Sequence, residues 1–231
     1  MRKCRNFKSI EGGLFFAEGG HFLTNVYFCA LKSPWVLIFV THCTIFESEN
    51  RFKTTDMEFQ ELITKRRSIR KFEPLAVPQE VVDRLVNATL TAPSSRNSRS
   101  THLMVIDNPE TIARMSEMRD YGSSFMKSAP LAIVVMGDTT VTDKWLVNAS
   151  ISATMLQLAC VDEGLGSCWV HVDGSLQFKD EPEGPKADEF LRKLLPIPDH
   201  MNILCAVAIG YTTFSPAALP EWDKEAHVHR L

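Results

Sequence analysis

Three short stretches of the sequence gather side chains that could bind a polar ligand. Residues 66–72, "RRSIRKF", place four cations around one hydroxyl, and these groups suit a phosphate or an electron-rich ring edge. Residues 92–98, "APSSRNS", combine short hydrogen-bonding side chains, which suit the edge of a flat polar ligand. Residues 163–170, "EGLGSCWV", contain two glycines that allow the backbone to approach a ligand closely. Each stretch alone also fits an ordinary helix end, loop or turn.

The composition limits the kinds of partner. The chain of 231 residues has a formal net charge of −3, so no extended basic surface for nucleic acid or an acidic membrane face is expected. The six cysteines form no CxxC pair and no zinc-type spacing with histidine, so neither a metal site nor a disulfide framework is predicted. Cys160 and Cys205 lie in apolar runs and are expected to be small buried hydrophobes. These features favour a reducing cytoplasm.

Residues 1–56 differ in character from the rest of the chain. Their apolar stretch is interrupted by Lys32 and Pro34, and residues 35–40 are far fewer than the roughly 20 needed to span a bilayer. The order of regions typical of a signal peptide is also missing. We expect residues 1–56 to be an upstream extension, either poorly ordered or due to a start site assigned too early, and residues 57–231 to form one domain.

From Met57 onward, helical and strand patterns alternate. Helical periodicity begins near Met57 and again after Pro78, where apolar residues recur on one face over 79–90. Residues 179–186 have the composition of a polar loop. Four short apolar runs predict strands that are buried on both faces and covered by helices: 102–107, 131–137, 167–172 and 203–210.

A helix of about twenty residues is predicted between the second and third of these runs. Thr142 or Asp143 is the expected N-cap, and Gly164 is the expected stop. Such a helix can pack closely on a neighbour, either in the core or at a subunit interface. Its packing face is wide and formed mostly by small side chains: Ala149, Ser152, Ala153, Leu156, Ala159 and Cys160.

The order of these features resembles the nitroreductase family of flavin enzymes. The resemblance covers residues 57–231. Its features follow one another in the family's order: "RRSIRKF", "APSSRNS", a strand, a second strand after "SAP", the long helix, "GLGSCW" and a final "AIGY". It implies an α+β fold in which a central, mainly antiparallel sheet is flanked by helices, in an intertwined homodimer. It also implies FMN at the dimer interface and a C-terminal tail that reaches across to the partner.

Carried over residue by residue, the resemblance assigns three groups of flavin contacts. The first would hold the FMN phosphate, the ribityl chain and the N1/O2 edge of the ring: Arg66, Arg67, Ser68 and Arg70. The second would reach FMN from the other subunit: Ser94, Ser95 and Asn97. The third would lie along the ring, with backbone groups near N5 and O4: Gly166, Ser167, Cys168 and Trp169. No side chain acts as a nucleophile on this reading, and Cys168 is a wall residue.

The implied activity is that of an FMN-dependent oxidoreductase with a ping-pong cycle. NAD(P)H would be the co-substrate that delivers hydride to flavin N5, and a nitroaromatic, a quinone or an enone would then take the electrons. Positive charge near N1 stabilises the anionic reduced flavin and raises its reduction potential. The expected location is the cytoplasm, with no membrane or nucleic-acid partner.

The sequence departs from the family pattern in three places. Arg99 stands where a neutral amide is common, which could shift substrate or nucleotide preference, and Asn148 stands where an Asp is common. Residues 210–222 lack the cation that usually follows this strand, so phosphate binding would depend more on the residue 66–70 cluster. Three later cations could substitute: Lys224, His227 and Arg230.

Two other classes of function remain open. A specialised or non-catalytic flavin binder, such as a flavin-modifying protein or an unusual dehydrogenase, would lack general nitroreductase activity if Arg99 and the altered tail block nicotinamide access. Oxidation of NADH or NADPH with an added acceptor separates this class from the first. An RNA- or phospholigand-binding module would use residues 66–71, but the sequence shows neither the aromatic platforms nor the broad basic surface of such modules.

Overall fold

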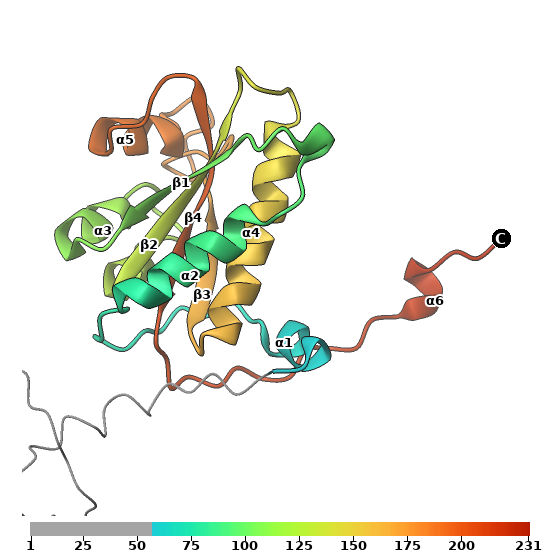
Figure 1. The fold of residues 1–231 in the computed structure, drawn as a ribbon. Coiled ribbons are helices and arrows are strands. Elements are labelled where there is room, and N and C mark those ends of the chain that lie inside the picture. Colours follow the sequence, from blue (N-terminus) through green and yellow to red (C-terminus); the bar gives the residue numbers. More distant parts are fainter. Residues whose placement is uncertain (1–56) are drawn as a thin grey trace, which may run out of the picture. The chain divides into compact units, whose positions relative to one another are not determined.

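A four-stranded antiparallel sheet forms the centre of the part described by the computed structural model, residues 57–231 (Figure 1). The expectation for residues 1–56 lies outside the described residues. The strand order is β1-β2-β4-β3, and every neighbouring pair is antiparallel. All four predicted strands are confirmed, with small differences in their bounds: β1 (Thr101–Ile106), β2 (Leu131–Asp138), β3 (Gly166–His171) and β4 (Met201–Gly210).

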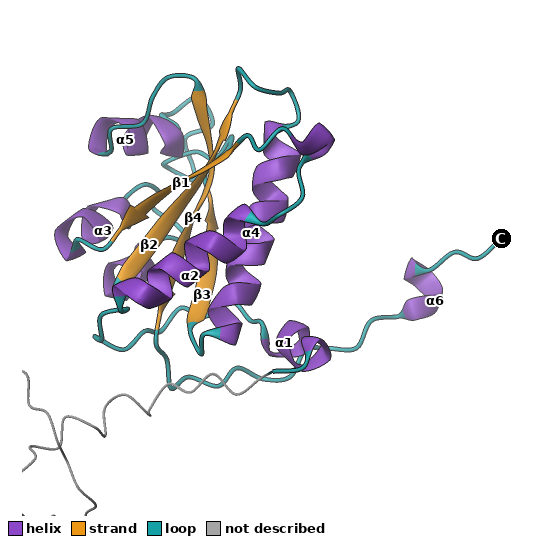
Figure 2. Cartoon of the chain, in the orientation of Figure 1, coloured by secondary structure: helices purple, strands orange, loops and turns teal. Residues whose placement is uncertain are grey.

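Helices cover both faces of the sheet, as Figure 2 shows. α2 (Gln79–Leu90) and α4 (Trp145–Asp162) pack on one face, and α3 (Pro109–Met115) and α5 (Ala187–Leu194) pack on the other. Side chains alternate along a strand, so Ile133 of β2 faces the α2/α4 layer and its neighbour Val134 faces the α3/α5 layer. This arrangement confirms the predicted α+β fold.

The two central strands are buried on both faces, which explains their continuous apolar runs. Residues 131–137 of β2 and 203–210 of β4 are buried throughout. The prediction of two-sided burial is wrong for β1, where Val105 is 41% exposed. β1 lies at the edge of the sheet and has no further strand beside it within the described chain, so part of its side chains face outward.

The helical patterns on either side of Pro78 are confirmed. α1 (Phe59–Lys65) begins two residues after Met57 and, within the described chain, buries none of its side chains. α2 follows Pro78 directly and presents one apolar face to the sheet. The buried residues of α2 agree with the predicted periodicity: Val81, Val82, Leu85 and Thr89.

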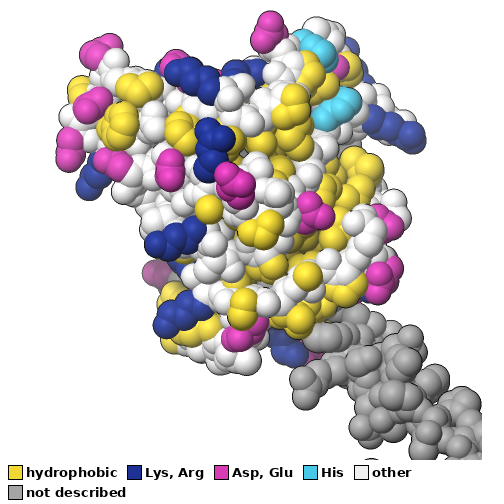
Figure 3. All heavy atoms as spheres, turned by 90° about the vertical axis from the view of Figure 1, so that its left-hand side faces the viewer, with side chains coloured by type: hydrophobic (Ala, Val, Ile, Leu, Met, Phe, Trp, Pro, Cys, Tyr) yellow, Lys and Arg dark blue, Asp and Glu magenta, His cyan; other side chains and the backbone are white. Residues whose placement is uncertain are grey.

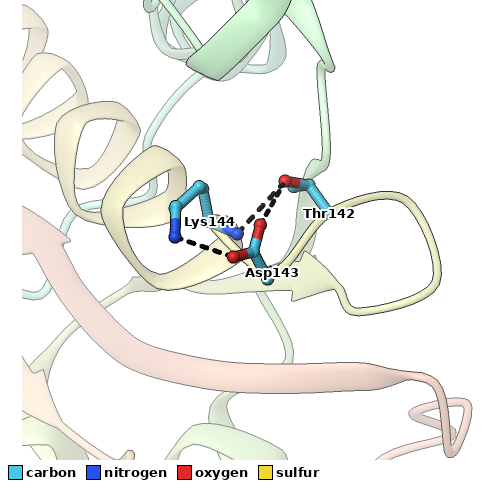
Figure 4. A network of polar contacts seen from close by, with 3 residues as sticks. All are labelled: Thr142, Asp143 and Lys144. Atoms are coloured by element: carbon cyan, nitrogen blue, oxygen red, sulfur yellow. Dashed lines mark hydrogen bonds and ion pairs between the residues drawn. The ribbon is translucent and has the colours of Figure 1, made fainter.

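The long helix α4 ends as predicted but begins slightly later than predicted. Gly164, with a φ of 70°, lies just beyond its C-terminus, in a conformation that glycine adopts without strain. The N-cap is Lys144 and not Thr142 or Asp143. Figure 4 shows why: Thr142 Oγ1 accepts the Lys144 amide at 3.1 Å, and the Asp143 carboxylate turns to Lys144 Nζ at 2.7 Å. Neither side chain therefore reaches the first turn of the helix.

The helices α3 and α5 and three shorter helical elements were not predicted. α3 carries ordinary start signals, because the Asn108 carboxamide oxygen accepts the Thr111 amide at 2.8 Å and Pro109 occupies the first turn. α5 follows the predicted polar loop and has acidic residues in its first turn and basic residues in its last. The short elements are η1 (Ser95–Asn97), η2 (Ser124–Ser128) and α6 (Lys224–His227).

The described surface carries charges of both signs. On the face drawn in Figure 3, lysine and arginine side chains alternate with aspartate and glutamate, and apolar side chains form a band between them. Within residues 57–231, no helix is both long and apolar enough to cross a membrane. Cys160 and Cys205 are buried among apolar neighbours, as predicted.

Candidate functional site

The first chemical motif lies against the outer edge of β3. A parallel bridge joins Ser68 to Ser167, and the Ile69 amide donates to the Ser167 carbonyl at 2.9 Å. Gly166 allows this contact, because a Cβ there would lie 2.8 Å from Ile69 Cγ2. The fold therefore brings together residues 66–70 and 166–169, which are far apart in the sequence. These two segments are called the β3-edge site below.

The cations of the β3-edge site have no carboxylate partner among the described residues. The ion pairs of this part of the chain all involve other side chains. Arg67 donates to the Ala217 carbonyl, and the Arg70 guanidinium lies 5.7 Å from the centre of the Phe125 ring. Since no carboxylate of residues 57–231 neutralises the positive charges of Arg66, Arg67 and Arg70, an anion bound between them would be stabilised.

The backbone of Trp169 offers a free hydrogen-bonding edge. Alternate residues of a strand direct their N–H and C=O groups to the same side, so Ser167, Trp169 and His171 share the outer edge of β3. The Ser167 carbonyl accepts from Ile69, and the His171 carbonyl accepts from Arg119 Nη1 at 2.9 Å. Between them, within residues 57–231, the Trp169 carbonyl meets only the Cys168 thiol at 3.7 Å. A flat polar ligand could pair with this edge.

The side chains of residues 166–169 do not all face one ligand. Ser167 lies beside Cys160, and Trp169 packs against the α2/α4 layer. Cys168 points to the opposite face, where Ser68, Arg66 and Arg70 are its neighbours. The strand alternation thus leaves the Cys168 side chain and the backbone edge as the parts of this segment that are next to the arginines.

The Cys168 thiol is not an activated nucleophile. Burial raises the pKa of the Cys168 thiol above its ordinary value, although Arg70, a hydrogen bond from Ser68 and Arg66 act in the opposite direction. Burial also raises the pKa of the neighbouring Cys160 to about 12. Both thiols are therefore protonated at neutral pH.

The second motif is a loop held by Asn148 at the start of α4. Asn148 is 1% exposed, and its carboxamide oxygen accepts the Ser95 amide at 2.9 Å. Its Nδ2 donates to Ser98 Oγ at 3.0 Å and to Ser100 Oγ at 2.9 Å. One buried side chain thus connects three positions of the loop and uses both its donor and its acceptor groups.

The backbone of this loop is strained. Arg96, Asn97 and Arg99 have φ values of 53°, 54° and 50°, in the left-handed region that arginine rarely adopts. Each such residue costs on the order of 1 kcal/mol, so the conformation persists only where surrounding contacts impose it. The Arg99 amide donates to Ser94 Oγ at 3.0 Å, which is one of these contacts. Strain of this kind is common at ligand sites.

The loop and the β3-edge site lie at opposite ends of α4, as Figure 1 shows. The loop is bonded to Asn148, whereas the turn into β3 is bonded to Cys160 through the Leu165 amide at 2.7 Å. A rise of 1.5 Å per residue places these two α4 residues about 18 Å apart along the helix. Within one chain, the structure therefore does not bring Ser94, Ser95 and Asn97 to the β3-edge site.

An ion pair between an exposed arginine and a largely covered glutamate fixes the turn between α4 and β3. Arg84 of α2 donates to both Glu163 carboxylate oxygens, at 2.6 Å and 2.7 Å, and the Glu163 side chain is only 10% exposed. The hydrogen bond and the charge of Glu163 raise the pKa of Arg84. A bidentate pair of this geometry holds α2 and the turn in register, and it thereby positions the "GSCW" segment.

The C-terminal tail passes beside the first motif without bringing a cation to it. Thr213 Oγ1 donates to Glu73 Oε1 at 2.9 Å, and Phe214 lies 5.2 Å from Lys71 Nζ. Lys224, His227 and Arg230 lie farther along the chain, within or after α6. Arg119 and Phe125, which also border the β3-edge site, were missed by the sequence reading, because neither belongs to a recognisable motif.

Known proteins share both the sequence and the fold of this chain. A family model described as "Nitroreductase family" matches residues 63–119 and 116–211. One relative is a protein of Methanothermobacter thermautotrophicus with the provisional name NADH dehydrogenase/NAD(P)H nitroreductase. It is 31% identical to this chain over 176 residues, and the match covers 75% of this chain and 87% of the relative. The structure of an FMN-dependent nitroreductase from Clostridium difficile is 35% identical, with a TM-score of 0.68 over 73% of this chain and 96% of that one.

A second solved structure supports the same comparison. It comes from Parabacteroides distasonis and has the same provisional name as the Methanothermobacter protein. The two chains are 28% identical, with a TM-score of 0.65, and the match covers 74% of this chain and 96% of that one.

Proposed function

Because the chain belongs to the nitroreductase family, we propose that it is an FMN-dependent oxidoreductase that passes electrons from NAD(P)H to small-molecule acceptors. The observation that carries the proposal is the group of three guanidinium side chains, without carboxylate partners in the described chain, beside a free strand edge. A phosphate and a flat heteroaromatic ring need these two features. The similar Clostridium difficile structure is that of an FMN-dependent enzyme, which supports the choice of flavin.

The residues of the β3-edge site fit the parts of FMN. Arg66 and Arg67 would hold the phosphate with Ser68, and Arg70 would lie at the N1/O2 edge of the ring. The Trp169 backbone would pair with the ring edge, and Gly166 and Cys168 would form the adjoining wall. Bound FMN would supply the redox chemistry, accepting hydride from NAD(P)H at N5 and transferring electrons to a nitroaromatic, quinone or enone. The arginine charge would favour the anionic reduced form.

A second copy of the chain would complete the site. The outer side of α4 is also apolar, with Val147 54% exposed and Ile151, Met155 and Leu158 partly exposed in the described chain. A helix that is apolar all round requires cover on both sides. Two copies related by a two-fold axis through α4 would bring the loop of one chain to the β3-edge site of the other. Ser94, Ser95 and Asn97 would then contact FMN from the partner.

An absorbance spectrum of the purified full chain tests the proposal. The protein should bind FMN, the flavin bands should bleach when NADPH or NADH is added without oxygen, and a quinone or nitroaromatic should restore them. Sedimentation should show a dimer. A protein that remains colourless after incubation with FMN would contradict the flavin site. A yellow protein that neither nucleotide reduces would instead be a specialised flavin binder.

Gly166→Ala should weaken FMN binding without unfolding the protein. The added Cβ would lie 2.8 Å and 2.9 Å from two Ile69 carbons and 3.0 Å from Thr212 Cγ2, so residues 68–70 must shift away from β3. We expect about a tenfold rise in the Kd for FMN, equivalent to one lost charge-assisted hydrogen bond. Titration of the apoprotein by flavin fluorescence measures the Kd. Gly174→Ala is the control for a general loss of stability: its φ of 65° strains an alanine, but the added Cβ meets no atom within 4 Å, so the Kd for FMN should stay near the native value.

Cys168→Ala should leave the reaction largely intact. The Cys168 thiol is protonated at neutral pH and is proposed only as a wall of the site, so it has no chemical step to perform. We expect the rate of flavin reduction by NAD(P)H to change by less than about threefold, because removal of one small side chain perturbs packing only modestly. Stopped-flow absorbance measures this rate. Loss of reduction in a variant that still binds FMN would assign the thiol a direct role.

A further inference from the structure

We infer that Arg96 and Arg99 form an anion-recognition element beside the flavin, so that the preferred substrate carries a carboxylate or a phosphate. The inference rests on the proposed function, because the loop of residues 94–99 meets the flavin of the partner subunit only if that site exists. It extends the function from a general electron acceptor to a substrate of defined charge.

The loop has an uncompensated positive charge. Between Asp83 and Asp107 the sequence contains no acidic residue, and Arg84 is already paired with Glu163. Arg96 and Arg99 are exposed and form no ion pair within the described chain. Two arginines three residues apart, without a counter-charge in the described chain, create a positive potential that attracts anions.

The nearest acidic groups are engaged elsewhere. The backbone amide of Asp138 donates to the Ser100 carbonyl of the loop at 2.8 Å. The Asp138 carboxylate, however, accepts from Thr140, at 2.8 Å from its amide and at 2.6 Å from its hydroxyl. Asp143 accepts from Lys144. Since no carboxylate of residues 57–231 pairs with Arg96 or Arg99, an external anion could bind to them.

The turn itself does not require arginine. Arg96 and Arg99 lie in the left-handed region, where glycine or asparagine would be less strained. Arginine at both positions is thus a cost to the turn, and its benefit must come from the guanidinium group. In Arg99 that group is oriented by Asn97, whose Oδ1 accepts from Nε at 3.3 Å, while the two Nη groups remain able to form a fork with an anion.

The position of the pair identifies what it would recognise. Asn97 is proposed to contact FMN, and the two arginines lie one residue before it and two residues after it. If Asn97 contacts the flavin, arginine side chains at these two positions are long enough to reach a substrate that stacks on the ring. The anion could be a carboxylate on the electron acceptor or the 2′-phosphate of NADPH. The two half-reactions of the flavin distinguish these sources.

The test measures each half-reaction of the FMN-loaded full chain separately, together with the Kd of each acceptor for the oxidised protein, read from the change in the flavin absorbance spectrum. In the reductive half, NADPH is compared with NADH; in the oxidative half, 4-nitrobenzoate is compared with 4-nitrobenzamide, which has a similar shape and no charge. The variants are Arg96→Gln, Arg99→Gln and the double variant. Arg114→Gln on α3 removes the same charge from another exposed helix and is the matched control.

We expect the double variant to reduce one of the two rate ratios, NADPH over NADH or nitrobenzoate over nitrobenzamide, by about tenfold. The rates with the neutral acceptor and with Arg114→Gln should remain within about twofold of the native values. Ratios that both stay unchanged would overturn the inference. If neither nucleotide reduces the flavin, the proposed NAD(P)H activity fails, and photoreduced flavin still allows the acceptor ratio to be measured.

Discussion

Replacing Arg66 and Arg70 together by glutamine is expected to raise the Kd for FMN by about two to four orders of magnitude, because each charged hydrogen bond contributes about 1.5–3 kcal/mol. Both side chains border the free edge of β3, and neither has a carboxylate partner among residues 57–231. The double variant should also have a lower flavin reduction potential, because it lacks a positive charge near N1. Fluorescence titration measures the Kd, and a dye-coupled redox titration measures the potential.

Lys65→Gln is the matched control for this prediction. Lys65 directly precedes Arg66, but its ammonium group lies 2.6 Å from a Glu61 carboxylate oxygen on the exposed side of α1. The same loss of charge at Lys65 should leave the Kd for FMN within about twofold of the native value. Exposed ion pairs of this kind contribute little to stability. The thermal unfolding of the apoproteins should be similar for the double variant, Lys65→Gln and the native protein. FMN binding of native strength by the double variant would show that the flavin lies elsewhere.

Asn148→Leu is expected to raise the Kd for FMN ten- to thirtyfold and to lower stability by about 2–4 kcal/mol, because it removes three hydrogen bonds, one of them to the buried Ser100 hydroxyl. The Asn148 side chain would no longer bond to three groups of the loop: the Ser95 amide, Ser98 Oγ and Ser100 Oγ. The left-handed residues of the loop would then relax, and the contacts proposed for the partner's flavin would be lost. FMN titration and urea unfolding measure the two effects.

Asn148→Asp separates positioning from simple stability. A carboxylate can still accept the Ser95 amide, and the hydroxyls of Ser98 and Ser100 can rotate and donate to it. We therefore expect this variant to bind FMN within about threefold of the native Kd, even if its stability is reduced by the buried charge. Equal losses of FMN affinity in the leucine and aspartate variants would contradict the positioning role.

Much of the fold could be predicted because its signals are local. The apolar runs at 131–137 and 203–210 are continuous since both strands are buried on both faces, and the stop at Gly164 follows from its left-handed conformation. The start of α4 was misplaced by one or two residues, because side chains at Thr142 and Asp143 bond to Lys144 and not to the helix. The two-sided burial expected for β1 was wrong, because edge and central strands differ only in their neighbours.

The groups available for chemistry can be named from the residues alone: the arginines of "RRSIRKF", the hydrogen-bonding turn of "APSSRNS" and the open backbone of "GLGSCW". Which of these groups lie together depends on how the chain folds. Residues 66–70 reach β3 through the Ile69 amide, whereas the "APSSRNS" loop is held about 18 Å away along α4 by Asn148. The reason is physical: side-chain chemistry is a property of each residue, but proximity depends on strand pairing and helix length, which involve residues distant in the chain.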